Sequence, residues 1–228
     1  MYIKSWFDIL EIRRYRNLLI SSLVICFFTL AFRYHSASSF LFPSLIENRL
    51  FAALAGFGIM CFLIPLASAP ILGDAEHFGF RVGNIKKWAS DLLFSYFIIL
   101  ALILIFARGP AFMRTYPLYK PACQSLALFL KFELAMMIYM FGWEFLFRGY
   151  YLFSIKKEVS ATAAIIIQML PFAFLHIGKP ELEAYGSVLA GIALGILAIR
   201  ANSFLPCAIL HFSASLTMDI VAIILHRS

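Results

Sequence analysis

Long apolar stretches alternate with short polar connections along the whole chain. A helix that crosses the hydrocarbon core of a bilayer needs about 20 mostly apolar residues. The sequence meets this requirement about seven times, so the pattern predicts an all-α fold, a multispanning transmembrane helix bundle. The expected spans are residues 17–34, 50–72, 89–107, 124–150, 160–176, 185–200 and 204–225.

The segments outside these spans are short. Residues 1–16 place apolar side chains at near-helical spacing between basic ones, which is typical of an amphipathic helix in the membrane interface. The longest polar connections, 73–88 and 107–123, have about 16 residues each, well below the roughly 50 residues that a soluble domain needs. We therefore expect residues 17–228 to form a single transmembrane helical domain.

The composition supports a membrane protein. Hydrophobic residues make up 63% of the 228 positions and charged residues 14%, against about 45–50% and about 25% in soluble domains. The net charge of +7 comes from Lys and Arg residues that separate the apolar runs. Because they do not cluster on one face, we expect the lipid bilayer as a partner and no nucleic acid.

The basic residues also indicate the orientation in the membrane. With the N-terminus inside, the inside segments hold ten Lys and Arg residues and the outside segments hold seven. An excess of positive charge marks the cytoplasmic side. We therefore expect a multi-pass protein of a cell membrane with its N-terminus in the cytoplasm.

Ionisable residues inside spans are candidates for functional roles because burying a charge in a bilayer is costly. Glu144 and Arg148 lie near the end of the fourth span and are four residues apart, so they share one face of a helix and can pair. Such a pair is consistent with a structural clamp and with a catalytic role, and the spacing alone does not separate the two.

Two histidines lie on other spans. His176 ends the fifth span, where a histidine often caps the last carbonyls of a helix. His211 lies in the seventh span, and Ser215 and Asp219 follow it at four-residue steps, so the three side chains form one polar stripe. The stripe is consistent with interhelical hydrogen bonds alone and also with a functional site that faces the bundle interior.

Small residues on the sixth span favour close packing of the helices. Ser187, Gly191 and Gly195 recur every four residues, a pattern that lets neighbouring helices approach closely. This packing would bring the polar residues of neighbouring spans together.

Glu144, His176 and His211 together suit the hydrolysis of an amide. A carboxylate can act as general base on water, an imidazole can orient that water or pass a proton, and a histidine with a hydroxyl can donate to a developing oxyanion. One Glu and two His can also ligate zinc, but no HExxH motif is present and the four cysteines stand singly. We therefore expect neither a metal nor another cofactor.

The motifs around these residues resemble those of the CAAX protease and bacteriocin-processing family (CPBP/Abi), intramembrane endopeptidases that include the Ras-converting enzyme. The resemblance covers roughly residues 75 to 220. The segment from Glu144 to Gly149 is similar to the second Glu through the Arg-Gly of the Glu-Glu-x-x-x-Arg motif. Phe172 and His176 match the Phe-x-x-x-His motif, and His211 matches the His of His-x-x-x-Asn.

Two positions depart from the family pattern. Trp143 stands where the family has its first Glu, the residue usually assigned as base, and Ser215 stands in place of the Asn. Either Glu144 has taken over the role of the base or water activation is lost. A hydroxyl at Ser215 still donates one hydrogen bond.

The resemblance implies a glutamate-dependent intramembrane endopeptidase that cleaves membrane-anchored or lipidated peptides or proteins near the C-terminus, in a bacterial cell. In this hypothesis Glu144 is the base, His176 is its partner, His211 and Ser215 are oxyanion donors and Arg148 positions Glu144. The missing first Glu favours an alternative, a non-catalytic peptide-binding or bacteriocin-immunity membrane protein of the same fold. A small transporter would be expected to contain inverted repeats, and the sequence has no internal symmetry of that kind.

Overall fold

The fold is helical throughout the part of the chain that the structure describes, as predicted. The computed structural model describes residues 14–34, 47–72 and 78–227. Most of the predicted interfacial segment, 1–16, therefore lies outside the described residues. The helices are α2 (Arg16–Tyr34), α3 (Glu47–Leu72), α4 (Ile85–Phe106), α5 (Pro110–Thr115), η2 (Lys120–Cys123), α6 (Leu126–Glu144), η3 (Phe145–Tyr151), α7 (Leu152–Ile155), α8 (Ala161–Phe174), α9 (Glu181–Ala201) and α10 (Leu205–Arg227).

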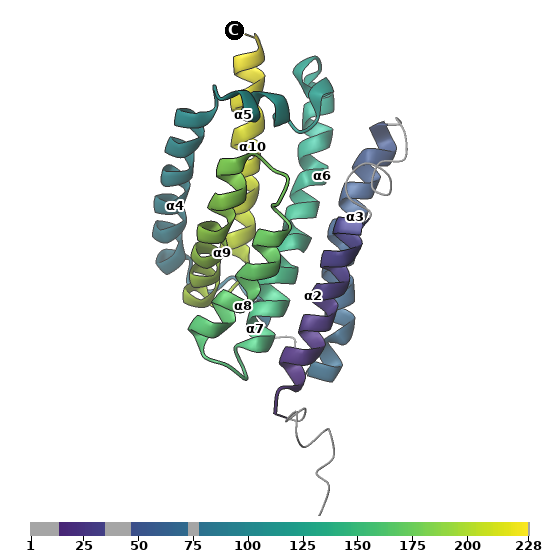
Figure 1. Ribbon diagram of the computed structural model, residues 1–228, viewed down its shortest axis with the longest axis vertical. Coiled ribbons are helices and arrows are strands. Elements are labelled where there is room, and N and C mark those ends of the chain that lie inside the picture. The colour runs from purple at the N-terminus through teal and green to yellow at the C-terminus, as the bar shows by residue number, and fades with distance from the viewer. Residues whose placement is uncertain (1–13, 35–46, 73–77, 228) are drawn as a thin grey trace, which may run out of the picture.

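The long helices run roughly parallel to the long axis of the molecule (Figure 1). α2 and α3 lie together on one flank, where α3 packs along α6. α4 covers the opposite flank and packs on α9 and α10. α6, α8, α9 and α10 form the centre of the bundle, and the short helices α5 and η2 cross one end of it near the C-terminus.

Each predicted span contains a helix, and α6 continues through η3 and α7. Among the described residues, four stretches are long and apolar enough to cross a membrane: Ile85–Phe106, Leu126–Ile155, Glu181–Ala201 and Leu205–Arg227. The other three helices have shorter described apolar stretches, which are Arg16–Ala31, Leu54–Ser68 and Ala161–Phe174. The total of about seven spans stays a prediction.

Polar side chains fix the ends of several helices. Asn84, Ser125 and Ser160 precede α4, α6 and α8, and each side chain accepts a hydrogen bond from a backbone N–H in the first turn. Such N-caps satisfy amide groups that have no partner within the helix. α9 ends at Asn202, which adopts the left-handed conformation with φ of 50°, a conformation that asparagine tolerates better than most residues.

Glycines allow two close helix crossings next to the polar residues. A Cβ atom at Gly142 on α6 would overlap the carbonyl group of Gly58 on α3. A Cβ atom at Gly191 on α9 would lie 2.8 Å from Cγ of Met169 on α8. The second crossing confirms that the predicted small-residue stripe brings α9 close to its neighbour.

A π-helix follows α6 directly. Its seven residues, Phe145–Tyr151, are all buried. A π-helical turn accommodates one extra residue and is frequent at functional sites. The Tyr150 hydroxyl accepts a hydrogen bond from Ser68 on α3 (2.9 Å), and the Tyr151 hydroxyl bonds Ser22 on α2 (3.1 Å). These bonds tie the π-helix to the flanking helices.

Candidate active site

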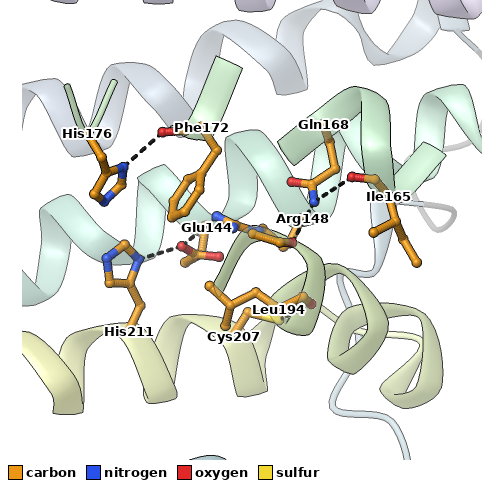
Figure 2. Close-up of polar contacts among 10 residues, drawn as sticks. Glu144, Arg148, Ile165, Gln168, Phe172, His176, Leu194, Cys207 and His211 are labelled. Carbon is orange, nitrogen blue, oxygen red and sulfur yellow. Dashed lines mark hydrogen bonds and ion pairs between the residues drawn. The ribbon is translucent and has the colours of Figure 1, made fainter. Parts of the chain in front are cut away.

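The last residue of α6, Glu144, lies at the centre of a buried polar cluster (Figure 2). Its side chain is fully buried. One carboxylate oxygen, Oε1, accepts hydrogen bonds from Nη1 of Arg148 at 2.9 Å and from Nδ1 of His211 at 2.6 Å. The structure thus brings together a Glu and an Arg of one continuous helical segment and a His of α10, which supports the expectation that these residues converge.

Arg148, in the π-helix, is also fully buried. Its guanidinium carbon lies 3.8 Å from the centre of the Phe172 ring on α8. A cation over an aromatic face is attracted by the ring, and more strongly where water is excluded. The arginine is therefore held between a carboxylate and an aromatic ring from another helix.

The hydrogen bond to Glu144 defines the tautomer of His211. A carboxylate only accepts hydrogen bonds, so Nδ1 of His211 carries the proton and donates it. In the neutral ring Nε2 is then the unprotonated nitrogen. The His211 side chain is 18% exposed, so this imidazole is more accessible than the carboxylate behind it.

His176 follows the C-terminal end of α8, and its Nδ1 bonds the backbone carbonyl of Phe172 at 2.8 Å. A carbonyl only accepts, so Nδ1 of His176 is also the protonated nitrogen. The two imidazole rings are 6.4 Å apart between centroids and inclined by 28°, and the Phe172 ring contacts both. The hydrogen-bonded partner of Glu144 is His211, and the roles of the two histidines stay a prediction.

Trp143 packs among aromatic rings on another face of the helix from Glu144. It is 4% exposed and packs against Tyr139 and Phe147 of its own helical segment and against Phe57 on α3. Adjacent residues of a helix differ in direction by about 100°, so the side chains of Trp143 and Glu144 lie on different faces. The carboxyl group that bonds His211 in this chain belongs to residue 144.

Residues 124–217 match the family model described as Type II CAAX prenyl endopeptidase Rce1-like. The chain carries an Rce1-like domain. The predicted resemblance to the CAAX protease family is thereby confirmed, and the matched segment contains Glu144, His176 and His211. Comparisons with curated proteins and with solved structures find no match.

The Rce1-like family is a protease family of membrane proteins. The match supports protease activity at the family level, and together with the four apolar helices it supports a location in a membrane. The expected peptide substrate associated with the membrane agrees with both.

The side chains of the predicted polar stripe on α10 do not all converge on one site. His211 bonds Glu144, whereas Asp219, two turns further along, accepts a hydrogen bond from the backbone N–H of Leu118 at 2.8 Å. Ser215 lies between them and is 3% exposed. Asp219 therefore holds the connection before η2 and does not join the cluster around Glu144.

A second group of polar contacts ties the connection between α5 and η2 to the Rce1-like domain. The Tyr116 hydroxyl donates to Oε2 of Glu183 at 2.6 Å, and Lys179 lies 3.6 Å from the other oxygen of that carboxylate. Burial and the negative charge of Glu183 raise the pKa of Tyr116 well above its usual value. A raised pKa favours the protonated phenol, which is the form that donates to Glu183.

Sequence reasoning missed Gln168 on α8, a fully buried amide in the Rce1-like domain that bonds the carbonyl of Gly191 at 2.8 Å. The signal was available, because a lone polar side chain in an apolar span must find a partner. Sequence reasoning also missed Glu133 on α6, which is 5% exposed and whose carboxylate oxygens have no hydrogen-bond partner among the described residues.

In the part of the chain that the structure describes, no group of three or more His, Cys, Asp or Glu side chains is arranged to hold a metal ion. The expectation of a reaction without a cofactor stays a prediction.

Proposed function

We propose that this protein is an intramembrane endopeptidase that depends on Glu144 and cleaves membrane-anchored or lipidated peptides near their C-terminus. The observation that carries the proposal is the 2.6 Å hydrogen bond between Glu144 and His211 inside an Rce1-like domain. A buried carboxylate that bonds an imidazole increases the basicity of the ring and fixes its orientation. This pairing supports a catalytic role for Glu144 in addition to its contact with Arg148.

We assign the general base to His211 and its activation to Glu144. Nδ1 of His211 donates to the carboxylate, so Nε2 is free to take a proton from water. The water oxygen attacks the carbonyl carbon of the scissile amide, and its proton passes to Nε2. The negative charge of Glu144 stabilises the imidazolium that forms, and the same proton then goes to the leaving amine as the carbon–nitrogen bond breaks.

His176 and Ser215 complete the proposed machinery. Nδ1 of His176 is engaged by the Phe172 carbonyl, so its Nε2 can only accept a hydrogen bond while the ring is neutral. This suits a residue that orients the attacking water between the two imidazoles. The hydroxyl of Ser215, one helical turn from His211, is the proposed donor to the oxyanion.

The reaction we propose takes place within the membrane. His211 is six residues from the start of α10, or about 9 Å along the helix axis at 1.5 Å per residue. We place the start of α10, together with the N-terminus of the chain, on the cytoplasmic side of a bacterial membrane. The substrate's scissile bond must therefore enter the bilayer to reach the site.

Purified full-length protein tests the proposal. The protein is reconstituted in nanodiscs with farnesylated and unmodified versions of a set of membrane-anchored peptides, and products are identified by mass spectrometry. We expect a shortened peptide from at least one substrate. We expect Glu144→Gln to lower the rate per folded molecule by about 10²–10⁴-fold, the range for loss of acid–base assistance.

Exposed residues supply matched controls. Glu181→Gln makes the same chemical change on the surface of α9, and His226→Ala removes an exposed histidine near the C-terminus. Both should cleave at the wild-type rate, while His211→Ala should be as slow as Glu144→Gln. Equal rates for Glu144→Gln and wild type would remove this carboxylate from the mechanism.

The alternative is a non-catalytic peptide-binding or immunity protein. It is favoured by Trp143, which stands where the family has a glutamate. Its indole occupies the position of a family glutamate and is buried among aromatic rings. If the wild-type protein retains a membrane-anchored peptide without shortening it, and His211→Ala binds that peptide as tightly, the binding function replaces the enzymatic one.

A further inference from the structure

The guanidinium of Arg148 has more donors than its contacts with Glu144 use. Arginine carries five N–H donors, and Nη1 provides the bond to Glu144. Among the described residues, Nε and Nη2 have no hydrogen-bond partner, although the side chain is fully buried. Buried polar groups in native proteins are nearly always hydrogen-bonded, so a group that accepts from these two nitrogens is required.

The two nitrogens form one edge of the planar guanidinium. Their N–H bonds are parallel and point away from Nη1, the atom that faces Glu144. This is the edge that binds an acceptor with two hydrogen bonds at once. Arg148 therefore offers a bidentate donor site on the side opposite the catalytic carboxylate.

Gln168 on α8 carries a second buried polar group with an unused atom. Its Nε2 donates to the carbonyls of Ile165 at 3.1 Å and Gly191 at 2.8 Å, which fixes the orientation of the amide. Its Oε1 is buried and has no partner among the described residues. Gln168 precedes Phe172 by one helical turn, so both side chains lie on the face of α8 that covers Arg148.

We infer that Gln168 is a positioning residue that holds Arg148 from the side opposite Glu144, through one ordered water molecule. The water accepts from Nε and Nη2 of Arg148 and donates to Oε1 of Gln168, which gives the three hydrogen bonds typical of a buried water. Arg148 is thereby fixed at both edges, and the carboxylate that it bonds is fixed with it. The positioning role rests on the proposed function, whereas the contact itself does not.

Moving the carboxylate from position 144 to position 168 tests the contact between Gln168 and Arg148. Glu144→Gln removes the charge that pairs with a buried arginine, so the melting temperature in detergent should fall by roughly 5 °C or more. In the double variant Glu144→Gln with Gln168→Glu, the new carboxylate meets the unused edge of Arg148. We expect the melting temperature to rise above that of Glu144→Gln, short of the wild-type value because the donors of the Gln168 amide are lost, while cleavage stays lost.

Gln124 provides the matched control because it is exposed and lies in the connection before α6. Gln124→Glu in the Glu144→Gln background adds the same charge away from Arg148 and should restore nothing. If the variant carrying Gln168→Glu melts no higher than this control, Gln168 does not face the free edge of Arg148. The melting temperatures decide this even if the wild-type protein cleaves no peptide.

The single variant Gln168→Glu provides a second measurement, which decides the matter if the Glu144→Gln variants do not fold. Its carboxylate competes with Glu144 for Arg148. We expect kcat to fall at least about tenfold, about 1.4 kcal/mol in the activation barrier, with KM close to wild type, and the melting temperature to fall because the carboxylate no longer donates to the carbonyls of Ile165 and Gly191. An unchanged kcat would overturn the positioning role.

Discussion

Arg148 shows how one residue links stability and proposed catalysis in this protein. Its charge is fully buried and is balanced by Glu144 at 2.9 Å and by the ring of Phe172 at 3.8 Å. Breaking a buried ion pair by removing one partner leaves the other charge without compensation, which is more costly than losing a surface contact. The clamp and the catalytic interpretation of Glu144 are therefore compatible.

The contacts of Arg148 predict how its replacement changes the stability of the protein. We expect Arg148→Ala to destabilise the protein by about 3–5 kcal/mol because Glu144 is left buried without its counter-charge. Arg148→Lys keeps the charge but loses the planar contact with Phe172, so it should fall between Arg148→Ala and wild type. Unfolding in detergent, followed by circular dichroism, measures both. Arg148→Ala as stable as wild type would mean that the pair contributes nothing.

Trp143 gives a second prediction for a single side chain. Because the indole packs on Phe57 and Tyr139, Trp143→Phe should cleave at close to the wild-type rate. Trp143→Glu recreates the family's pair of glutamates but places a carboxylate among aromatic rings, so it should destabilise the protein and leave cleavage no faster. Faster cleavage by Trp143→Glu, measured per folded molecule, would contradict this placement of the side chain.

The helices place the site through two features, the crossing of α3 with α6 and the π-helix that follows. The crossing brings the backbones of Gly58 and Gly142 into contact one residue before Trp143. The π-helix then carries Arg148 to the same side as Glu144, toward α8 and α10. Together they orient the two charged side chains relative to His211.

Gly56 and Gly142 test the crossing as a matched pair. A methyl group at Gly142 would overlap the backbone of α3, so we expect Gly142→Ala to destabilise by about 1–3 kcal/mol. No atom lies within 4 Å of a Cβ built at Gly56, so Gly56→Ala should be neutral or stabilising by up to about 1 kcal/mol. Equal melting temperatures for the two variants would show that the helices do not meet at Gly142.

The helices were predictable from the sequence, whereas the π-helix was not. In a bilayer, a run of about 20 apolar residues adopts an α-helix, because every backbone group must be hydrogen-bonded within the segment. A π-helical turn replaces one set of backbone bonds by another and leaves no periodic pattern in side-chain polarity. The partner of Glu144 depends on how α6 and α10 are rotated against each other, so the sequence predicted that the side chains would meet but not which imidazole would bond the carboxylate.

At the scale of the whole molecule, the orientation in the membrane stays a prediction, which the basic residues at the helix ends make testable. The basic residues at the start of α2, at the start of α4 and at the end of α9 belong to one end of the bundle: Arg16, Lys86, Lys87 and Arg200. The C-terminus lies at the other end (Figure 1). Positive charge collects on the cytoplasmic side, so the C-terminus should face outward.

Fusions at the C-terminus test this orientation in bacterial cells. We expect alkaline phosphatase fused after Ser228 to be active, because it folds only outside the cytoplasm, and green fluorescent protein at the same position to stay dark. An inactive phosphatase fusion and a fluorescent green fluorescent protein fusion would contradict this orientation. They would place the start of α10, the end of that helix nearest to His211, outside the cytoplasm.

The central claim is that Glu144 and His211 act as one unit, and a double-mutant cycle measures this most directly. We expect Glu144→Gln, His211→Ala and the double variant to show the same residual cleavage rate per folded molecule, since removing either member disables the pair. If the losses of the two single variants multiply in the double variant, the residues act independently and the proposed mechanism is wrong.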